Sequence, residues 1–139
     1  MDIRISFPGG TRIDAQIGDL TIATDQPAAA GGSGKAAGPF DLFLASIGTC
    51  VGYYVLAFCR TRGIPTEGLA VVERVTDDAR THLPLRIDID VVLPPGFPEQ
   101  HRVGVRHAAE HCKVKKVLAA PPVVAVHLSD PAAAHTTAA

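Results

Sequence analysis

The sequence predicts an α+β fold in which antiparallel strands surround one long, uncharged helix, and two observations carry this prediction. Within residues 38–63, no formal charge occurs between Asp41 and Arg60, a pattern typical of a helix that is buried on most of its circumference. The segments on both sides alternate apolar and polar residues with the two-residue period of half-buried strands. In a chain of 139 residues, these elements predict a single domain over residues 1–128.

The chain opens with strands. Three short segments alternate in this way: residues 3–7, 13–17 and 20–24. The turn signals between them are Pro8-Gly9-Gly10 and Gly18-Asp19, which permit two chain reversals. We therefore expect a three-stranded antiparallel meander.

The next segment, residues 26–38, consists largely of alanine, glycine and serine. Such a composition buries too little apolar surface to offset the entropy lost on ordering. It predicts a mobile loop, which is either a passive connector or a flap over a site.

The central helix has clear ends, because Pro39 suits a first helical turn and Gly63 suits a C-terminal cap. Gly48 and Gly52 lie one turn apart, on a face that a second helix could approach closely. The uncharged run reaches the lower length limit of a transmembrane span. Its glycine and hydroxyl residues and the flanking amphipathic strands favour a buried helix instead, so we expect no membrane partner.

Two longer strands are expected after the helix: one begins with residues 69–73, and the other covers residues 85–93. A second helix should begin at Pro98, where the negative charge of Glu99 suits the helix dipole. Its apolar positions recur with helical spacing up to Cys112, which predicts that this cysteine lies on the buried stripe.

The C-terminal part should contain three further features. These are a short helix over residues 114–118, a final strand over residues 123–128 and a disordered tail over residues 129–139.

Charge and composition restrict the function. The net charge of −1, without a basic patch, argues against a nucleic-acid partner. The N-terminus lacks the apolar run of a signal peptide, which predicts a cytoplasmic protein. Three cysteines in that compartment indicate thiol chemistry or core packing rather than structural disulfides.

The cysteines are candidate functional residues. Cys50 and Cys59 are nine residues apart, and at about 100° per residue they fall on opposite faces of one helix. Cys112, on another buried helix, is the plausible mate for Cys50. The alternative is that these thiols only fill the core, since free cysteine is among the residues most often buried.

A reactive Cys50 needs a nearby cation, because it lies too far from the helix start for the dipole to stabilise a thiolate. Arg12, just past the Gly9-Gly10 turn, is the better candidate. The other candidates are Arg4, Lys113, Lys115 and Lys116.

His107 and His111 share a helix face, and Cys112 follows directly, a spacing similar to that of metal ligands. However, His111 and Cys112 project about 100° apart on a helix. We therefore expect solvated histidines and no metal or other cofactor.

Three segments together resemble the OsmC/Ohr family: PFDLFLASIGTC, RGIPTEG and AEHCKVKKVL. The resemblance covers about residues 1–128. It implies an OsmC-like fold, in which two long central helices pack together in an intertwined homodimer and are wrapped by antiparallel sheets from both subunits.

The resemblance also implies a peroxidase of the oxidative stress response. Cys50 would attack an organic hydroperoxide and become a sulfenic acid, Cys112 would form a disulfide with it, and an external dithiol would regenerate the enzyme. Arg12 would stabilise the thiolate, and Asp41 would orient Arg12.

The chain departs from the family at two positions. Phe40 stands where the peroxidase branches place the glutamate that holds the catalytic arginine, and Lys113 replaces a proline. These departures place the chain in a divergent branch. They also keep open a second hypothesis, a non-catalytic dimeric binding protein whose cysteines line a pocket for a small apolar ligand.

Overall fold

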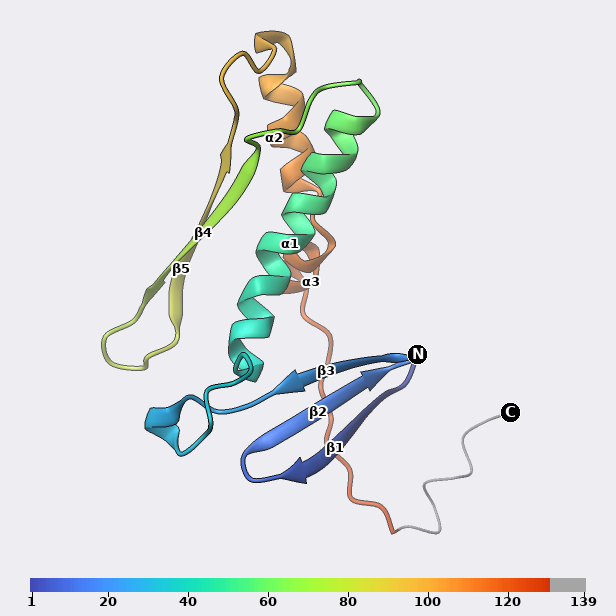
Figure 1. Cartoon of the computed structure of the whole chain (residues 1–139), viewed down its shortest axis with the longest axis vertical. Coiled ribbons are helices and arrows are strands. Elements are labelled where there is room, and N and C mark those ends of the chain that lie inside the picture. The colour runs from blue at the N-terminus through green and yellow to red at the C-terminus, as the bar shows by residue number, and fades with distance from the viewer. Residues whose placement is uncertain (131–139) are drawn as a thin grey trace.

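A long helix, α1 (Pro39–Arg60), forms the axis of the molecule, with a β-hairpin and two short helices beside it (Figure 1). A three-stranded sheet lies beyond the N-terminal end of α1. The computed structural model describes residues 1–130. Mixed helices and antiparallel sheets confirm the predicted α+β class.

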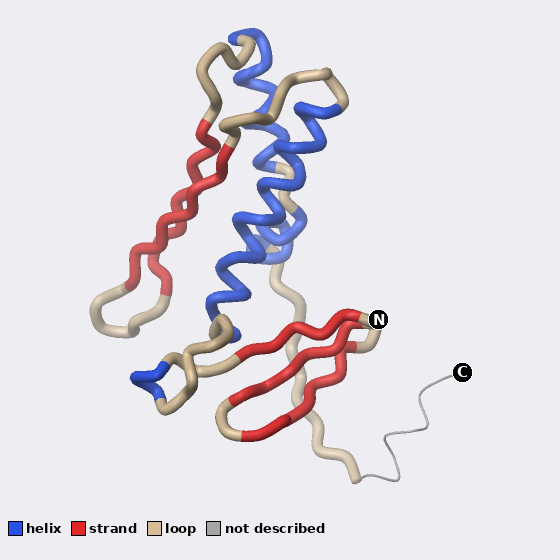
Figure 2. Tube along the Cα trace, viewed as in Figure 1, coloured by secondary structure: helices blue, strands red, loops and turns tan. Residues whose placement is uncertain are grey.

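The N-terminal sheet consists of β1 (Ile3–Gly9), β2 (Arg12–Ile17) and β3 (Leu20–Thr24), in the predicted antiparallel order. Pairing of Ile3 with Ile17 and the alternation along each strand place the aliphatic side chains on one face. No residue of this sheet belongs to the hydrophobic core cluster, and the sheet stands apart from the hairpin (Figure 2). Its apolar face is therefore largely uncovered: Ile3 is 49% exposed.

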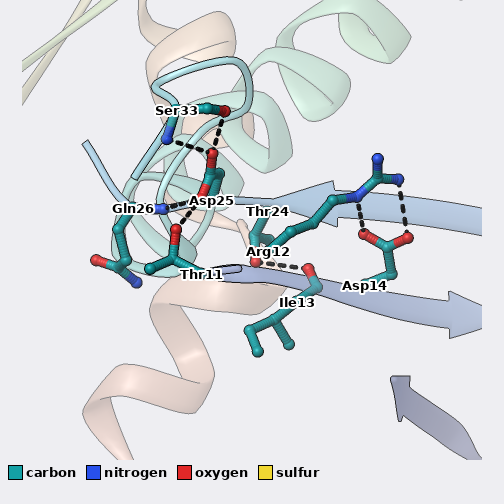
Figure 3. Close-up of polar contacts among 8 residues, drawn as sticks. All are labelled: Thr11, Arg12, Ile13, Asp14, Thr24, Asp25, Gln26 and Ser33. Atoms are coloured by element: carbon teal, nitrogen blue, oxygen red, sulfur yellow. Dashed lines mark hydrogen bonds and ion pairs between the residues drawn. The ribbon is translucent and has the colours of Figure 1, made fainter. Parts of the chain in front are cut away.

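The loop over residues 26–38, expected to be mobile and structureless, contains a short 3-10 helix, η1 (Ala28–Ala30), and is tied to the sheet by Asp25. The carboxylate of Asp25 accepts hydrogen bonds from the Thr11 hydroxyl at 2.5 Å and the Ser33 backbone N–H at 2.9 Å (Figure 3). The Ser33 hydroxyl also donates to it. The composition of the loop could not reveal this, because the carboxylate that organises it lies outside the loop.

The hairpin pairs β4 (Ala70–Asp77) with β5 (Pro84–Val92). This confirms both predicted strands. Gly48 and Gly52 of α1 face this hairpin rather than a second helix of the same chain. A Cβ atom on Gly52 would lie 3.9 Å from Val71 Cγ2 of β4.

The C-terminal part contains a 3-10 turn, η2 (Glu99–His101), and two helices, α2 (Arg102–Glu110) and α3 (Lys113–Ala119). The prediction that Cys112 belongs to the second helix is wrong, because the helix breaks after Glu110 and Cys112 is the N-cap residue of α3, with ψ at 123°. Cys112 is nevertheless fully buried.

The predicted strand over residues 123–128 is not formed. A strand needs a neighbour for its backbone hydrogen bonds, and the described part of the chain supplies none there. The side chains of this segment are accordingly exposed, with Val123 at 95%. Most of the tail that we expect to be disordered, residues 131–139, lies outside the described residues.

The core lies where α1 meets α2, α3 and the hairpin. One stripe of α1, formed by Val51, Val55 and Cys59, packs against Val105 and Cys112 from the C-terminal helices. By length and composition alone, α1 could also cross a membrane. A single helix of this kind is weak evidence, because the core helix of a globular domain has the same properties.

Candidate active site

The structure brings Cys50 and Cys112 together from different elements. Cys50 lies on the side of α1 that faces the α2–α3 junction, and its sulfur is within hydrogen-bonding reach of the Cys112 thiol. The Cys112 sulfur also lies 3.9 Å from the carbonyl oxygen of Ile47, one turn before Cys50. Cys50 remains partly exposed, whereas Cys112 is buried, and both are free thiols.

The surroundings favour the thiolate form of Cys50. Burial is the largest single influence and opposes ionisation, but the pKa of Cys50 is nevertheless lowered. The neighbouring Cys112 thiol is the largest influence that favours the thiolate, the backbone N–H groups of Val114 and Lys113 follow, and the charge of Lys113 adds to them. Several hydrogen bonds to one sulfur thus outweigh its partial desolvation.

Cys112 is shifted in the opposite direction. Burial raises its pKa, and its hydrogen bond to Cys50 raises it further, because the proton shared by the pair stays on Cys112. The pair therefore consists of an accessible thiolate and a buried thiol that can donate a proton or attack in turn.

Sequence reasoning missed the two backbone N–H groups. It considered Lys113 only as a charge and did not predict the helix break that turns the first residues of α3 toward Cys50. No glycine or proline marks this break in HCKVKK, so the usual punctuation signal is lacking.

Arg12, the cation expected at Cys50, lies elsewhere in the chain. Its guanidinium pairs with Asp14 on the same strand at 2.8 Å (Figure 3), and this pairing raises the pKa of Arg12. Within one chain, the charge that acts on Cys50 is that of Lys113.

Asp41 has a local partner. Its carboxylate accepts a hydrogen bond from the Gly38 backbone N–H at 2.9 Å and so caps the start of α1. Phe40, beside it, is half exposed and stacks on Phe43 with ring centroids 5.6 Å apart. The structure therefore does not bring Asp41 to Arg12.

The remaining candidates, Cys59, His107 and His111, lie outside the Cys50–Cys112 pair. Cys59 is completely buried in the core, and this burial raises its pKa against the opposing charge of Arg62. His111 Nδ1 lies 2.8 Å from the carbonyl oxygen of His107. Over residues 1–130, no three histidine, cysteine or acidic side chains converge as metal ligands would.

Comparison with known proteins decides the family. The model of the family described as OsmC-like protein matches residues 32–127. The chain belongs to the OsmC-like family. The resemblance of the two cysteine segments is thereby confirmed, because Cys50 and Cys112 both lie within the matched region.

Solved structures show the same OsmC-like fold. A protein from Psychrobacter arcticus, proposed to act in the osmotic stress and detoxification response, is 21% identical with a TM-score of 0.69, over 82% of this chain and 85% of that one. An organic hydroperoxide resistance protein OsmC from Legionella pneumophila is 20% identical with a TM-score of 0.51, over 85% and 89% of the two chains. No curated protein matches the chain.

Proposed function

We propose that this OsmC-like protein is a thiol-dependent peroxidase that reduces organic hydroperoxides in the response to oxidative stress. The observation that carries the proposal is the Cys50–Cys112 pair, in which one pKa is lowered and the other is raised. Such a pair supplies a nucleophile and a resolving thiol side by side. The Legionella relative, an organic hydroperoxide resistance protein, supports the substrate class.

The reaction follows from the two protonation states. The Cys50 thiolate attacks the terminal, hydroxyl-bearing peroxide oxygen, the O–O bond breaks, and the alkoxide leaves as an alcohol after taking up a proton. Cys50 is then a sulfenic acid. The Cys112 sulfur attacks it, a disulfide forms, and the hydroxyl group leaves as water with the Cys112 proton. An external dithiol reduces the disulfide and restores both thiols.

We propose that the protein acts as a homodimer. The chain exposes 10684 Å², whereas a compact monomer of 14.5 kDa exposes about 6,900 Å². The surplus is about 3,800 Å² per chain, and part of it belongs to the extended segment 121–130. An obligate homodimer needs only about 1,000–2,500 Å² from each chain. The apolar face of the N-terminal sheet contributes to the surplus.

The alternative of a binding protein whose cysteines line a ligand pocket has less support. An apolar groove lies between α1 and β4, and neither Cys50 nor Cys112 is among the residues that line it. The cysteines instead face each other at the α2–α3 junction.

The peroxidase proposal is tested by counting thiols after treatment with one equivalent of cumene hydroperoxide. The wild-type protein should lose two thiols and regain them with dithiothreitol, and Cys112→Ser should stop at a sulfenic acid that a dimedone probe captures. Cys59→Ala is the matched control and should still lose two thiols. If Cys50→Ser consumes hydroperoxide as fast as the wild-type protein, Cys50 is not the nucleophile.

A further inference from the structure

One acidic side chain of the described residues has no partner although its charged atoms are buried. Glu73 projects from β4 toward α1, and both of its carboxylate oxygens are inaccessible to solvent without a hydrogen bond to any described residue. One of them would lie 2.8 Å from a Cβ atom placed on Gly48, so the glycine leaves the space that the carboxylate occupies.

This arrangement is unfavourable in an isolated chain. A buried carboxylate loses its hydration, and the loss is compensated only by a close cation or by several hydrogen bonds. Nearly all buried polar groups in folded proteins have such partners, so an orphan requires an explanation. The explanation must come from outside the described part of the chain.

The surroundings of Glu73 form a docking groove. It has a volume of about 690 Å³ and runs between β4 and the stripe of α1 that contains Leu44, Gly48, Gly52 and Leu56. Its lining is otherwise uncharged, and Glu73 is the one ionisable residue in its wall. An occupant that fits must therefore be mainly apolar and carry one positive charge.

A second copy of this chain meets both requirements. It has an apolar surface to bury, because its N-terminal sheet exposes Ile3, Phe7 and Leu20. It also carries four arginines whose side chains form neither an ion pair nor a hydrogen bond with any described residue: Arg4, Arg60, Arg80 and Arg106. Arginine is the cation best suited to a buried interface, because its planar guanidinium is weakly hydrated and matches a carboxylate with two hydrogen bonds.

We propose that Glu73 is the interface acid of the dimer: the second copy occupies the α1–β4 groove and places an arginine guanidinium against the Glu73 carboxylate. The guanidinium of the second copy attracts the Glu73 carboxylate, which moves away from Gly48 and toward the groove. Two-fold symmetry repeats the ion pair on the other side of the interface. This inference rests on the proposed homodimer. It adds that dimer formation depends on the charge of Glu73.

The test compares Glu73→Gln with the wild-type protein by sedimentation equilibrium and circular dichroism. Glutamine keeps the shape and removes the charge, so an arginine would be left buried and unpaired. We expect a folded protein whose dimer dissociation constant is at least about 30-fold higher, the effect typical of breaking one partner of a buried ion pair. Asp77→Asn is the matched control, because it removes one exposed charge from the same strand and should leave the constant unchanged.

The opposite result is equally clear. If the carboxylate remains unpaired in the dimer, Glu73→Gln removes the cost of burying its charge, and the dimer becomes tighter. If water binds the carboxylate, the substitution leaves the dimer dissociation constant unchanged. Either outcome overturns the role of Glu73 while the dimer itself stands. A wild-type monomer, by contrast, overturns the homodimer and this inference together.

A charge-reversal experiment identifies the partner and remains informative if Glu73→Gln does not fold. Glu73→Lys should not self-associate, and it should regain a dimer when mixed with a copy in which the pairing arginine is changed to glutamate. Each of the four arginine variants is mixed in turn with Glu73→Lys. Failure of all four to restore a dimer contradicts an arginine partner.

Discussion

At the scale of single residues, the neighbours of a thiol rather than its residue type decide the direction in which its pKa shifts. Cys50 and Cys59 lie on the same helix, yet the pKa of Cys50 is lowered and that of Cys59 is raised. Both are partly or wholly desolvated. The difference is that Cys50 receives hydrogen bonds from Cys112 and from two backbone N–H groups, whereas burial dominates at Cys59.

The first prediction concerns this activation. Cys50 should alkylate with iodoacetamide at a pH below the ordinary thiol pKa of about 8.5, measured by mass spectrometry in a Cys59→Ala background. Cys112→Ala removes the thiol donor and should raise the midpoint most. Lys113→Ala removes a charge but keeps its N–H group, so it should raise the midpoint less.

Arg12→Ala decides where the activating groups come from. We expect no change in the alkylation midpoint, because Arg12 pairs with Asp14 and Lys113 supplies the charge at Cys50. If Arg12→Ala raises the alkylation midpoint more than Lys113→Ala does, this account is contradicted. Such a result would indicate that Arg12 of a second copy lies near the thiolate.

The second prediction concerns Asp25. Its hydrogen bonds with Ser33, Thr11 and Gln26 outweigh burial and hold the pKa well below its usual range. A lowered native pKa stabilises the fold above the unfolded value of about 3.9, and this stabilisation is lost as the pH falls through the native value. Asp25→Asn should therefore melt at a lower temperature than wild type at pH 7, and the difference should shrink below pH 4. Asp19→Asn, in an exposed turn, is the control; parallel behaviour of Asp25→Asn and Asp19→Asn would contradict the role of Asp25.

At the scale of elements, α1 carries two faces with different partners. The Val51–Val55–Cys59 stripe packs into the core, and the Gly48–Gly52 stripe faces β4. Small residues on the second face set the distance between helix and hairpin, and so the width of the groove between them.

The third prediction follows from that spacing. Gly52→Ala should be tolerated, because its Cβ atom would lie in ordinary contact with Val71 Cγ2 at 3.9 Å, and alanine favours a helix by about 1 kcal/mol over glycine. Gly52→Leu should cost about 1–3 kcal/mol of folding or assembly free energy, since the longer side chain forces α1 and β4 apart or fills the groove. Urea denaturation and sedimentation measure both effects, and a Gly52→Leu dimer as stable as Gly52→Ala would refute the close packing.

At the scale of the whole molecule, the chain is incomplete as a packed unit. The N-terminal sheet stands beyond the end of α1 with its apolar face uncovered (Figure 1), and the segment over residues 123–128 exposes Val123 and Val126 almost fully. A second copy could cover both surfaces and supply a strand partner for the segment.

The fourth prediction is that the protein sediments as a homodimer at micromolar concentration. The exposed apolar face of the N-terminal sheet and the exposed valines of residues 123–128 favour an obligate association. A stable, folded monomer at that concentration would refute it. Removal of residues 121–139 should weaken the dimer without unfolding the core, because the core cluster ends at Val114.

The sequence by itself determined most of the elements and the candidate pair of cysteines, Cys50 and Cys112. Strand alternation and the uncharged run of α1 are local patterns, and local patterns survive in any tertiary context that buries one face. The order of elements and the segments around Cys50 and Cys112 were enough to indicate the family. The strand expected over residues 123–128 is not formed, because the pattern of a segment does not show whether a neighbouring strand is available to pair with it.

Only the tertiary structure decided what activates Cys50 and what organises the loop and the groove. The helix break at Cys112, the N–H groups of Lys113 and Val114, the donors around Asp25 and the isolation of Glu73 all depend on which groups meet across space. A hydrogen bond extends over about 3 Å, whereas these partners are up to 64 positions apart in the chain, as Cys50 and Val114 are. Periodicity records which side of an element is buried but not which atom lies opposite it, and the chemistry of a thiol or a carboxylate depends on that atom.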